Sequence, residues 1–176
     1  MSRVTLVTGG ARSGKSRYAL ARMEPYRKRA FIATAEALDG EMRDRIARHQ
    51  AERADAFLTV EAPLALGEAI RWLPSGTDAA IVDCLTVWLG NLMHHFGDEE
   101  APRREAIDAL LEAVTTAPCD LVVVTNELGM GIVPDNELAR RFRDEAGRLN
   151  QDVAALADEV VWVVSGLPVH LKRSRE

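Results

Sequence analysis

The 176-residue sequence has only two cysteines, Cys84 and Cys119. They are too few and too far apart in the chain for a metal knuckle or a dithiol redox motif, and nothing suggests an oxidising compartment. We therefore expect both residues to be small buried thiols.

The sequence also lacks any apolar run long enough to cross a bilayer, and Met1-Ser2-Arg3 leads directly into an expected strand without a signal segment. Its formal net charge of −5 argues against a broad nucleic-acid-binding surface, which would require clustered excess lysine and arginine. It contains no internal repeat and no low-complexity linker. With 47% hydrophobic and only 5% aromatic residues, we expect one cytoplasmic globular domain spanning residues 1–176.

The chain contains a complete Walker A phosphate-binding loop. In such a loop the backbone N–H groups cradle phosphates, Lys15 can reach the β and γ phosphates, and the Ser16 hydroxyl can hold Mg²⁺. A β-branched segment, 4–7, precedes the motif and a segment that can be helical, 16–21, follows it. A glycine-rich turn joining two elements is the alternative, but the order strand, loop, helix favours a nucleoside triphosphate site. The motif consists of Gly9, Gly10, Ala11, Arg12, Ser13, Gly14, Lys15 and Ser16.

Strand-like and helix-like segments alternate along the chain. Because the strands read as continuous apolar runs, we expect a mostly parallel sheet with helices on both faces, an α/β fold of the P-loop NTPase (RecA-like) type. The expected strands are 4–7, 29–33, 59–61 at an edge, 79–83, 120–125 and 159–164; the expected helices are 16–21, 40–53, 63–73, 85–95, 103–115 and 135–156.

The outer faces and the end of the chain give further expectations. The charges of helix 103–115, beginning with Arg103, are expected to be solvated. The segment from His170 onward is expected to be a tail. The inner stripe of helix 135–156 is expected to be Leu138, Phe142, Ala146, Leu149 and Val153.

Several motifs fall at the carboxyl ends of expected strands, where parallel α/β sheets bind ligands. Asp83 ends strand 79–83 in the manner of a Walker B acid that supports Mg²⁺, although capping of the next helix is an alternative. Conformational freedom at Gly129 and Gly131 would let the backbone approach a ligand, though a plain turn fits equally well. The motifs expected to converge on one cleft are Gly9 to Ser16, Thr34 to Glu36, Asp83 and Asn126-Glu127.

His49 has two interpretations at this point. It lies in expected helix 40–53 at the end of an apolar stripe, and this spacing alone favours a structural histidine. Arg45 and Arg53, one turn to either side, would disfavour the imidazolium and leave a neutral nucleophile.

The chain resembles the bifunctional adenosylcobinamide kinase/adenosylcobinamide-phosphate guanylyltransferase family of cobalamin biosynthesis. The resemblance runs from the first strand to Ser165-Gly166 and covers nearly the whole chain. It is carried by Thr8 to Ser16, Ile32-Ala33-Thr34, Glu41-Met42, Arg45-Ile46, His49, and the run Val124-Thr125-Asn126-Glu127-Leu128-Gly129-Met130-Gly131-Ile132-Val133-Pro134.

The resemblance implies two reactions. ATP or GTP would phosphorylate the aminopropanol hydroxyl of adenosylcobinamide, and GTP would then transfer GMP to an enzyme histidine with release of pyrophosphate. The corrinoid phosphate would attack that intermediate to give adenosylcobinamide-GDP. The family's guanylylated histidine falls on His49, which reverses the interpretation from spacing alone. An imidazole with an unperturbed pKa of about 6.5 is largely neutral at pH 7 and can attack phosphorus, while Lys15, Mg²⁺ and the loop amides would stabilise the departing pyrophosphate.

The resemblance also assigns binding residues. Glu61 is a candidate for reading guanine, because a carboxylate can accept from the ring N–H and the exocyclic amine. Asp83 stands where the family has Glu as readily, and either carboxylate can serve Mg²⁺. The GTP-binding set implied is Thr34, Ala35, Glu36, Gln50, Ala51, Glu52, Arg53, Glu61 and Asp83, and the corrinoid set is Asn126, Glu127, Gly129 and Gly131.

The family resemblance and the apolar segment 85–93 suggest a homo-oligomer such as a trimer. Two other functions remain open from sequence: a P-loop kinase acting on another small alcohol, with His49 structural, and a nucleotide-binding regulator without turnover.

Overall fold

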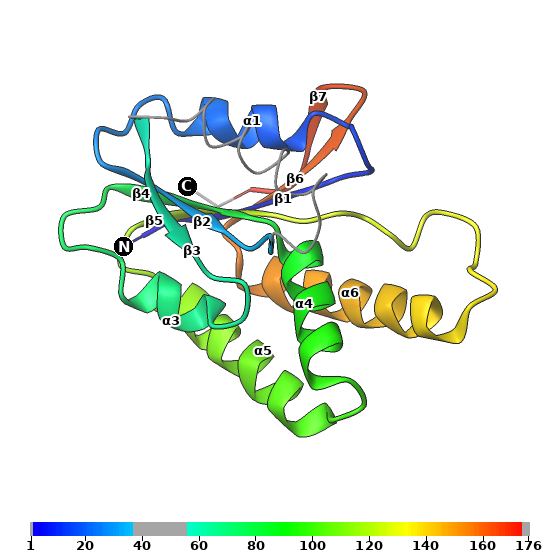
Figure 1. The fold of residues 1–176 in the computed structure, drawn as a ribbon. Coiled ribbons are helices and arrows are strands. Elements are labelled where there is room, and N and C mark those ends of the chain that lie inside the picture. Colours follow the sequence, from blue (N-terminus) through cyan, green and yellow to red (C-terminus); the bar gives the residue numbers. More distant parts are fainter. Residues whose placement is uncertain (1, 37–55, 174–176) are drawn as a thin grey trace.

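The computed structural model describes residues 2–36 and 56–173, in which seven strands form one sheet (Figure 1). The strand order is β3-β2-β4-β5-β1-β6-β7. Strands β1 to β6 are paired in parallel, and β7 is antiparallel to β6. The strands are β1 Val4–Thr8, β2 Arg29–Ala33, β3 Leu58–Glu61, β4 Ala79–Asp83, β5 Asp120–Val124, β6 Glu159–Val164 and β7 Leu167–Lys172. The expected mostly parallel α/β sheet, with 59–61 at its edge, is confirmed.

The described helices cover the two faces unequally. Helix α1 lies on one face, and α3, α4, α5 and α6 lie on the other (Figure 1). None of the helices within the described ranges combines the length and the apolar character needed to cross a bilayer. Their bounds are α1 Lys15–Arg22, α3 Leu66–Arg71, α4 Leu85–Phe96, α5 Glu100–Thr115 and α6 Glu137–Leu156.

Each central strand contributes alternate side chains to two cores. In β1, Leu6 joins the larger core under α3 to α6, whereas Val7 joins the smaller core under α1. All five residues of β1 are buried, as expected for a strand covered on both faces. Both cysteines are buried as predicted, and burial raises the pKa of the Cys119 thiol to about 11.

The expected tail from His170 is wrong at its start, because His170 to Lys172 belong to β7, and residues 174–176 fall outside the described residues. The Ser165-Gly166 turn has φ values of 51° and 79°, so it can join antiparallel strands tightly. Val164 then pairs with Leu167, and Val161 pairs with His170. The segment does carry the period-two alternation of a strand, with Leu167, Val169 and Leu171 separated by Pro168, His170 and Lys172. Pro168 is tolerated because β7 lies at the edge of the sheet.

Three helix predictions also need correction. Helix α3 begins at Leu66 rather than at Pro63, and Leu138 is 61% exposed rather than part of the inner stripe of α6. Arg103, expected in solvent, is only 2% exposed. Its guanidinium donates to the carbonyl oxygens of Gly97 and Glu99 and lies 3.5 Å from Glu145 Oε1. Arg103 is therefore not a solvated surface charge, and its hydrogen bonds fix the start of α5.

Candidate functional site

The phosphate-binding loop leaves the carboxyl end of β1 and enters α1 at Lys15. Gly14 precedes the helix with φ of 100°, a conformation that favours glycine. Lys15 is buried, and its Nζ donates to the carbonyl oxygen of Gly10 at 2.6 Å, so the side chain lies back across the loop. Burial lowers the pKa of Lys15, while neighbouring Cys84 and Asp83 act in the opposite direction. The Lys15 ammonium is thus available to exchange its hydrogen bond to the Gly10 carbonyl for one to a phosphate oxygen.

Asp83 ends β4 and faces this loop. Its Oδ2 lies 3.5 Å from the Ser16 hydroxyl oxygen. Hydroxyl and carboxylate oxygens are ligands suited to Mg²⁺, so the donor set fits the metal expected at a Walker A and Walker B pair. The alternative that Asp83 caps the next helix is wrong, because the N-cap of α4 is Cys84.

A buried network fixes the carboxyl end of β2. The Thr34 hydroxyl donates to the carbonyl oxygen of Cys84 at 2.9 Å and accepts from the Cys84 N–H at 2.8 Å. Asn91 Nδ2 donates to the carbonyl oxygens of Thr34, at 2.6 Å, and Pro63, at 3.1 Å. The Thr34 side chain is therefore occupied by protein contacts and positions Ala35 and Glu36, which are both partly exposed.

A second network fixes the end of β5. The Thr125 hydroxyl donates to Asn150 Oδ1 at 2.7 Å, and Asn150 Nδ2 donates to the carbonyl oxygen of Asn126 at 3.1 Å. The N–H of Asn126 donates to the Thr86 hydroxyl at 2.8 Å. The N–H of Glu127 donates to the carbonyl oxygen of Gly9 at 3.0 Å, so the loop after β5 is joined directly to the phosphate loop.

Sequence reasoning missed Thr86, Asn91 and Asn150. Each places a polar side chain on the buried side of a helix, α4 for the first two and α6 for Asn150. A polar residue on an otherwise apolar helix face was the available signal, because buried polar groups require partners.

The model of the cobinamide kinase / cobinamide phosphate guanyltransferase family matches residues 5–171. The chain belongs to this family. The resemblance carried by the phosphate loop and by the Asn126 to Pro134 run is thereby confirmed.

Named relatives agree with the family match. Bifunctional adenosylcobalamin biosynthesis protein CobP of Pseudomonas aeruginosa is 45% identical over 169 residues, 95% of this chain and 96% of its own. Bifunctional adenosylcobalamin biosynthesis protein CobU of Salmonella typhimurium is 43% identical over 178 residues, 95% and 98% of the two chains. Escherichia coli CobU is 42% identical with the same coverage.

One solved structure supports the fold alone. It is described as "Structural study of Project ID PH0250 from Pyrococcus horikoshii OT3" and matches with a TM-score of 0.58 at 8% identity. The match covers 99% of this chain and 88% of the other.

The other residues that the family resemblance assigns to GTP binding lie at different distances from the phosphate loop. Glu61 ends β3, whose place in the sheet is four strands from β1. With neighbouring strands roughly 4.8 Å apart, Glu61 lies about 19 Å along the sheet edge from the start of the phosphate loop. Thr34 to Glu36 and Asp83 lie between them. His49 and Gln50 to Arg53 fall outside the described residues.

The loop from Asn126 to Asn136 carries an exposed apolar group. Met130 is 73% exposed, Ile132 96% and Val133 58%. Figure 1 shows this loop, in yellow, extending beyond the sheet before α6 begins. Gly129 and Gly131 are exposed there, beside the partly exposed Asn126 and Glu127.

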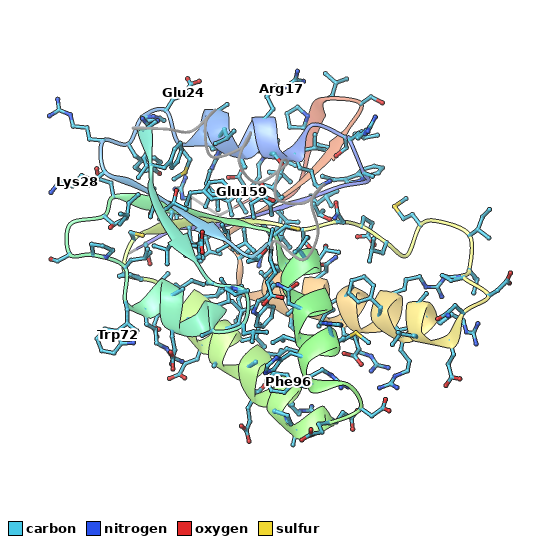
Figure 2. The ribbon with its side chains drawn as sticks, in the orientation of Figure 1. Arg17, Glu24, Lys28, Trp72, Phe96 and Glu159 are labelled. Atoms are coloured by element: carbon cyan, nitrogen blue, oxygen red, sulfur yellow. The ribbon has the colours of Figure 1, made fainter. Side chains whose placement is uncertain are left out.

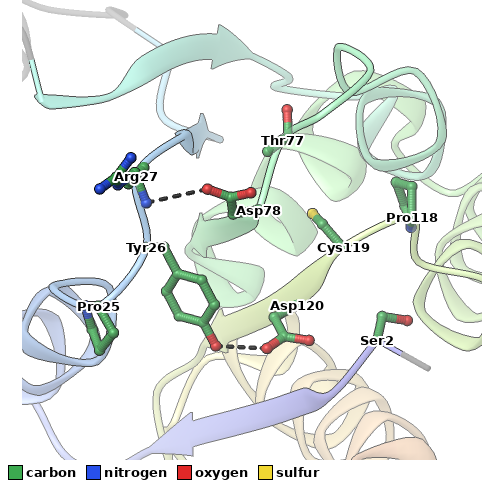
Figure 3. A pocket seen from close by; sticks show the side chains of 9 residues that line it. All are labelled: Ser2, Pro25, Tyr26, Arg27, Thr77, Asp78, Pro118, Cys119 and Asp120. Atoms are coloured by element: carbon green, nitrogen blue, oxygen red, sulfur yellow. Dashed lines mark hydrogen bonds between the residues drawn. The ribbon is translucent and has the colours of Figure 1, made fainter.

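A separate hollow of about 590 Å³ lies at the opposite edge of the sheet (Figure 3). It is lined in part by Asp78 and Asp120, which adjoin the amino ends of β4 and β5. Asp120 Oδ2 accepts from the Tyr26 hydroxyl at 2.6 Å, and Asp78 Oδ2 accepts from the N–H groups of Arg27 and Lys28. These carboxylates are engaged by protein donors and lie away from the phosphate loop.

Proposed function

We propose that this chain, as one P-loop domain spanning residues 1–176, catalyses both reactions named in its family's description. It would phosphorylate adenosylcobinamide and then convert the phosphate to adenosylcobinamide-GDP in cobalamin biosynthesis. The observation that carries the proposal is the convergence of Lys15, Ser16 and Asp83 at the phosphate loop of a chain that matches the family over residues 5–171.

In the kinase step, the loop amides and Lys15 bind the phosphates of ATP or GTP. The aminopropanol hydroxyl oxygen of adenosylcobinamide forms a bond to the γ-phosphorus and its proton is released to solvent. The bond between the γ-phosphorus and the bridging oxygen breaks, and the nucleoside diphosphate leaves. Ser16 and Asp83 would hold Mg²⁺, which neutralises phosphate charge when bound. Lys15 contributes by exchanging the Gly10 carbonyl for a phosphate oxygen whose negative charge develops in the transition state.

In the transferase step, a ring nitrogen of His49 attacks the α-phosphorus of GTP and pyrophosphate leaves. A phosphate oxygen of the corrinoid substrate then attacks the same phosphorus, the N–P bond breaks, and His49 is regenerated. Splitting the transfer into two displacements is the general advantage of a covalent nucleophile. Thr34, Ala35, Glu36, Gln50 to Arg53 and Glu61 would hold the GTP, with Glu61 reading the guanine edge.

The corrinoid would be bound by the loop that contains Asn126, Glu127, Gly129 and Gly131. Support comes from the hydrogen bond between Glu127 and Gly9, which joins this loop to the phosphate-binding loop, and from its exposed Met130 and Ile132, which suit an apolar macrocycle. We further propose a cytoplasmic enzyme that forms a homo-oligomer, with a trimer as the state to test by light scattering.

The decisive experiment is incubation of the purified chain with Mg²⁺ and GTP labelled at the α-phosphate. We expect a covalent label that is lost in acid and survives alkali, as for a phosphoramidate, together with release of pyrophosphate. Phosphorylation of a small alcohol without any covalent label would favour a simple P-loop kinase. Nucleotide binding without pyrophosphate release or phosphoryl transfer would favour a regulator.

A further inference from the structure

The turn between β6 and β7 contacts the phosphate loop. The N–H of Gly166 donates to the carbonyl oxygen of Ser13 at 2.8 Å. Ser13 lies in the middle of the Walker A motif, so a residue 153 positions later in the chain bonds to the loop that binds phosphate. No motif in the sequence connects these two segments.

Glycines of the phosphate loop also pack directly on this part of the sheet. A Cβ added to Gly9 would collide with the carbonyl oxygen of Val163 in β6. A Cβ added to Gly14 would lie 3.2 Å from the Cα of Gly166, and Gly14 has a φ of 100°. The first glycine of the loop thus packs against β6, and the last glycine packs against the turn.

The β6–β7 hairpin that carries the turn is held along its length and at its open end. Antiparallel pairing fixes β7 to β6, and Lys172 Nζ donates to the carbonyl oxygens of Ala154 and Ala155 in α6 at 3.1 and 2.9 Å. On the other face, Glu159 lies 2.8 Å from His170 Nδ1 and 2.6 Å from Arg22 of α1. Figure 2 shows Arg17 on α1 near β7, and a Cβ on Gly166 would lie 3.0 Å from its Nη2 atom.

We propose that the β6–β7 turn is a positioning element of the nucleotide site and that Gly166 is its positioning residue. The carbonyl of Ser13 and the N–H of Gly14 belong to one planar trans peptide and point in opposite directions. Holding that carbonyl against Gly166 therefore aims the Gly14 N–H away from the turn, toward the interior of the loop where phosphate binds. The proposal rests on the proposed function, since it supposes that the loop binds nucleotide.

The test compares Gly166→Ala with Gly76→Ala. Gly76 has a φ of 83°, close to the 79° of Gly166, and a Cβ there would lie 3.3 Å from Lys28 Nζ, again the end of a flexible cationic side chain. The backbone penalty is therefore matched. Lys28 precedes β2, at the amino ends of the parallel strands, whereas the phosphate loop follows the carboxyl end of β1, so the control is remote from the phosphate loop.

We expect both variants to lose a similar amount of thermal stability, because an alanine is strained at these φ values. The Kd for Mg-GTP, measured by calorimetric titration, should rise about tenfold or more in Gly166→Ala, since a misaimed N–H loses a hydrogen bond to charged phosphate. The KM for nucleotide should rise in both reactions, whereas Gly76→Ala should bind as the wild type does.

Gly166→Asn provides the rescue, because asparagine and alanine both keep the backbone N–H and add the same Cβ, but asparagine tolerates positive φ better. It should bind Mg-GTP within about threefold of the wild type, the remaining difference reflecting the tolerated left-handed strain. A folded Gly166→Asn variant as weak as Gly166→Ala, or equal Kd values for the two alanine variants, would overturn this inference alone. Failure of the wild-type chain to bind any nucleotide would overturn the proposed function as well.

Discussion

The Ser16 hydroxyl lies 3.5 Å from a carboxylate oxygen of Asp83, although the two residues are 67 positions apart in sequence. One comes from the first turn of α1 and the other from the end of β4, so only the folded sheet brings them together. Hydroxyl and carboxylate oxygens placed together in this way can hold a divalent cation. We therefore expect metal dependence to be sensitive to either residue.

Asp83→Asn should lower kcat for both reactions by about a hundredfold or more, because a neutral amide stabilises Mg²⁺ and the developing phosphate charge less well. Mg²⁺ titration of the initial rate is the measurement. Asp78→Asn is the control, since Asp78 adjoins the opposite end of the same strand. Equal loss in the two variants would indicate a stability effect in place of a metal site.

Lys15 should make nucleotide binding pH-dependent. Burial lowers the pKa of its ammonium below the ordinary value of 10.5, whereas bound phosphates favour the charged form and raise that pKa. Affinity for Mg-GTP should therefore be greatest below the lowered pKa and fall as pH rises through it. The free energy of unfolding without nucleotide should change in the opposite sense, rising from the lowered pKa toward 10.5, because the unfolded chain binds this proton more tightly.

Kd values for Mg-GTP measured across alkaline pH test this linkage. Lys15→Met should bind Mg-GTP weakly at every pH, and its plot of log Kd against pH should lack the slope that Lys15 contributes. A slope unchanged in Lys15→Met would assign the pH dependence to another group.

His49→Ala should abolish covalent labelling by GTP while sparing much of the kinase activity, since only the transferase step uses the imidazole. The kinase reaction with unlabelled ATP and the labelling reaction are measured on the same preparation. His95→Ala is the control, because His95 is an exposed residue of α4. Parallel loss of both activities in His49→Ala would mean that this histidine supports the shared site or the fold.

Asn150→Ala should affect corrinoid use more than nucleotide use. The substitution removes the hydrogen bonds to Thr125 and Asn126, which hold the start of the loop proposed to bind the corrinoid. We expect the KM for adenosylcobinamide to rise about tenfold, as for a lost buried hydrogen bond of about 1.4 kcal/mol. Gln151→Ala, on the exposed side of the same helix, should leave it unchanged. A rise in nucleotide KM alone would contradict this role.

Arg103→Ala should destabilise the fold by about 3 kcal/mol, because it removes a buried guanidinium and leaves the Gly97 and Glu99 carbonyls without that donor. Urea denaturation gives the free energy of unfolding. Arg104→Ala is matched in chemistry but exposed on the same helix, so it should change stability by less than about 0.5 kcal/mol. Similar values for the two variants would show that burial of Arg103 contributes little.

The phosphate loop, the central strands and the order of the elements could be predicted because each has a local cause. The Walker A residues are contiguous, and strands such as Val4–Thr8 are apolar throughout because both faces are covered. Asp83 was predictable for the same reason, as it follows a buried strand directly. The family's specific loop, Asn126 to Pro134, is likewise a contiguous run.

The errors concern residues whose surroundings are set by distant parts of the chain. The sequence around Arg103 is typical of a surface charge in an amphipathic helix. In the fold, however, its side chain is buried and donates to the carbonyl oxygens of Gly97 and Glu99, between α4 and α5. Leu138 fits the apolar period of α6, but it is the second residue of the helix and its side chain is 61% exposed. β7 has the alternation of a strand at Leu167, Val169 and Leu171, but the turn at Ser165-Gly166 and the antiparallel pairing with β6 decide its place in the sheet. Asn91 and Asn150 become positioning residues only in the folded chain, where they donate hydrogen bonds to carbonyl oxygens in segments that follow other strands.

The hydrogen bond from the Glu127 N–H to the Gly9 carbonyl joins the loop proposed to bind the corrinoid to the phosphate-binding loop, so that binding at the two proposed sites can be linked. A corrinoid that orders the loop after β5 would also order Gly9, the first residue of the phosphate loop. Because linkage is reciprocal, any factor by which the corrinoid tightens nucleotide binding is the factor by which nucleotide tightens corrinoid binding. The enzyme would then favour the ternary complex over either half-filled state, which limits hydrolysis of the nucleotide when no acceptor is present.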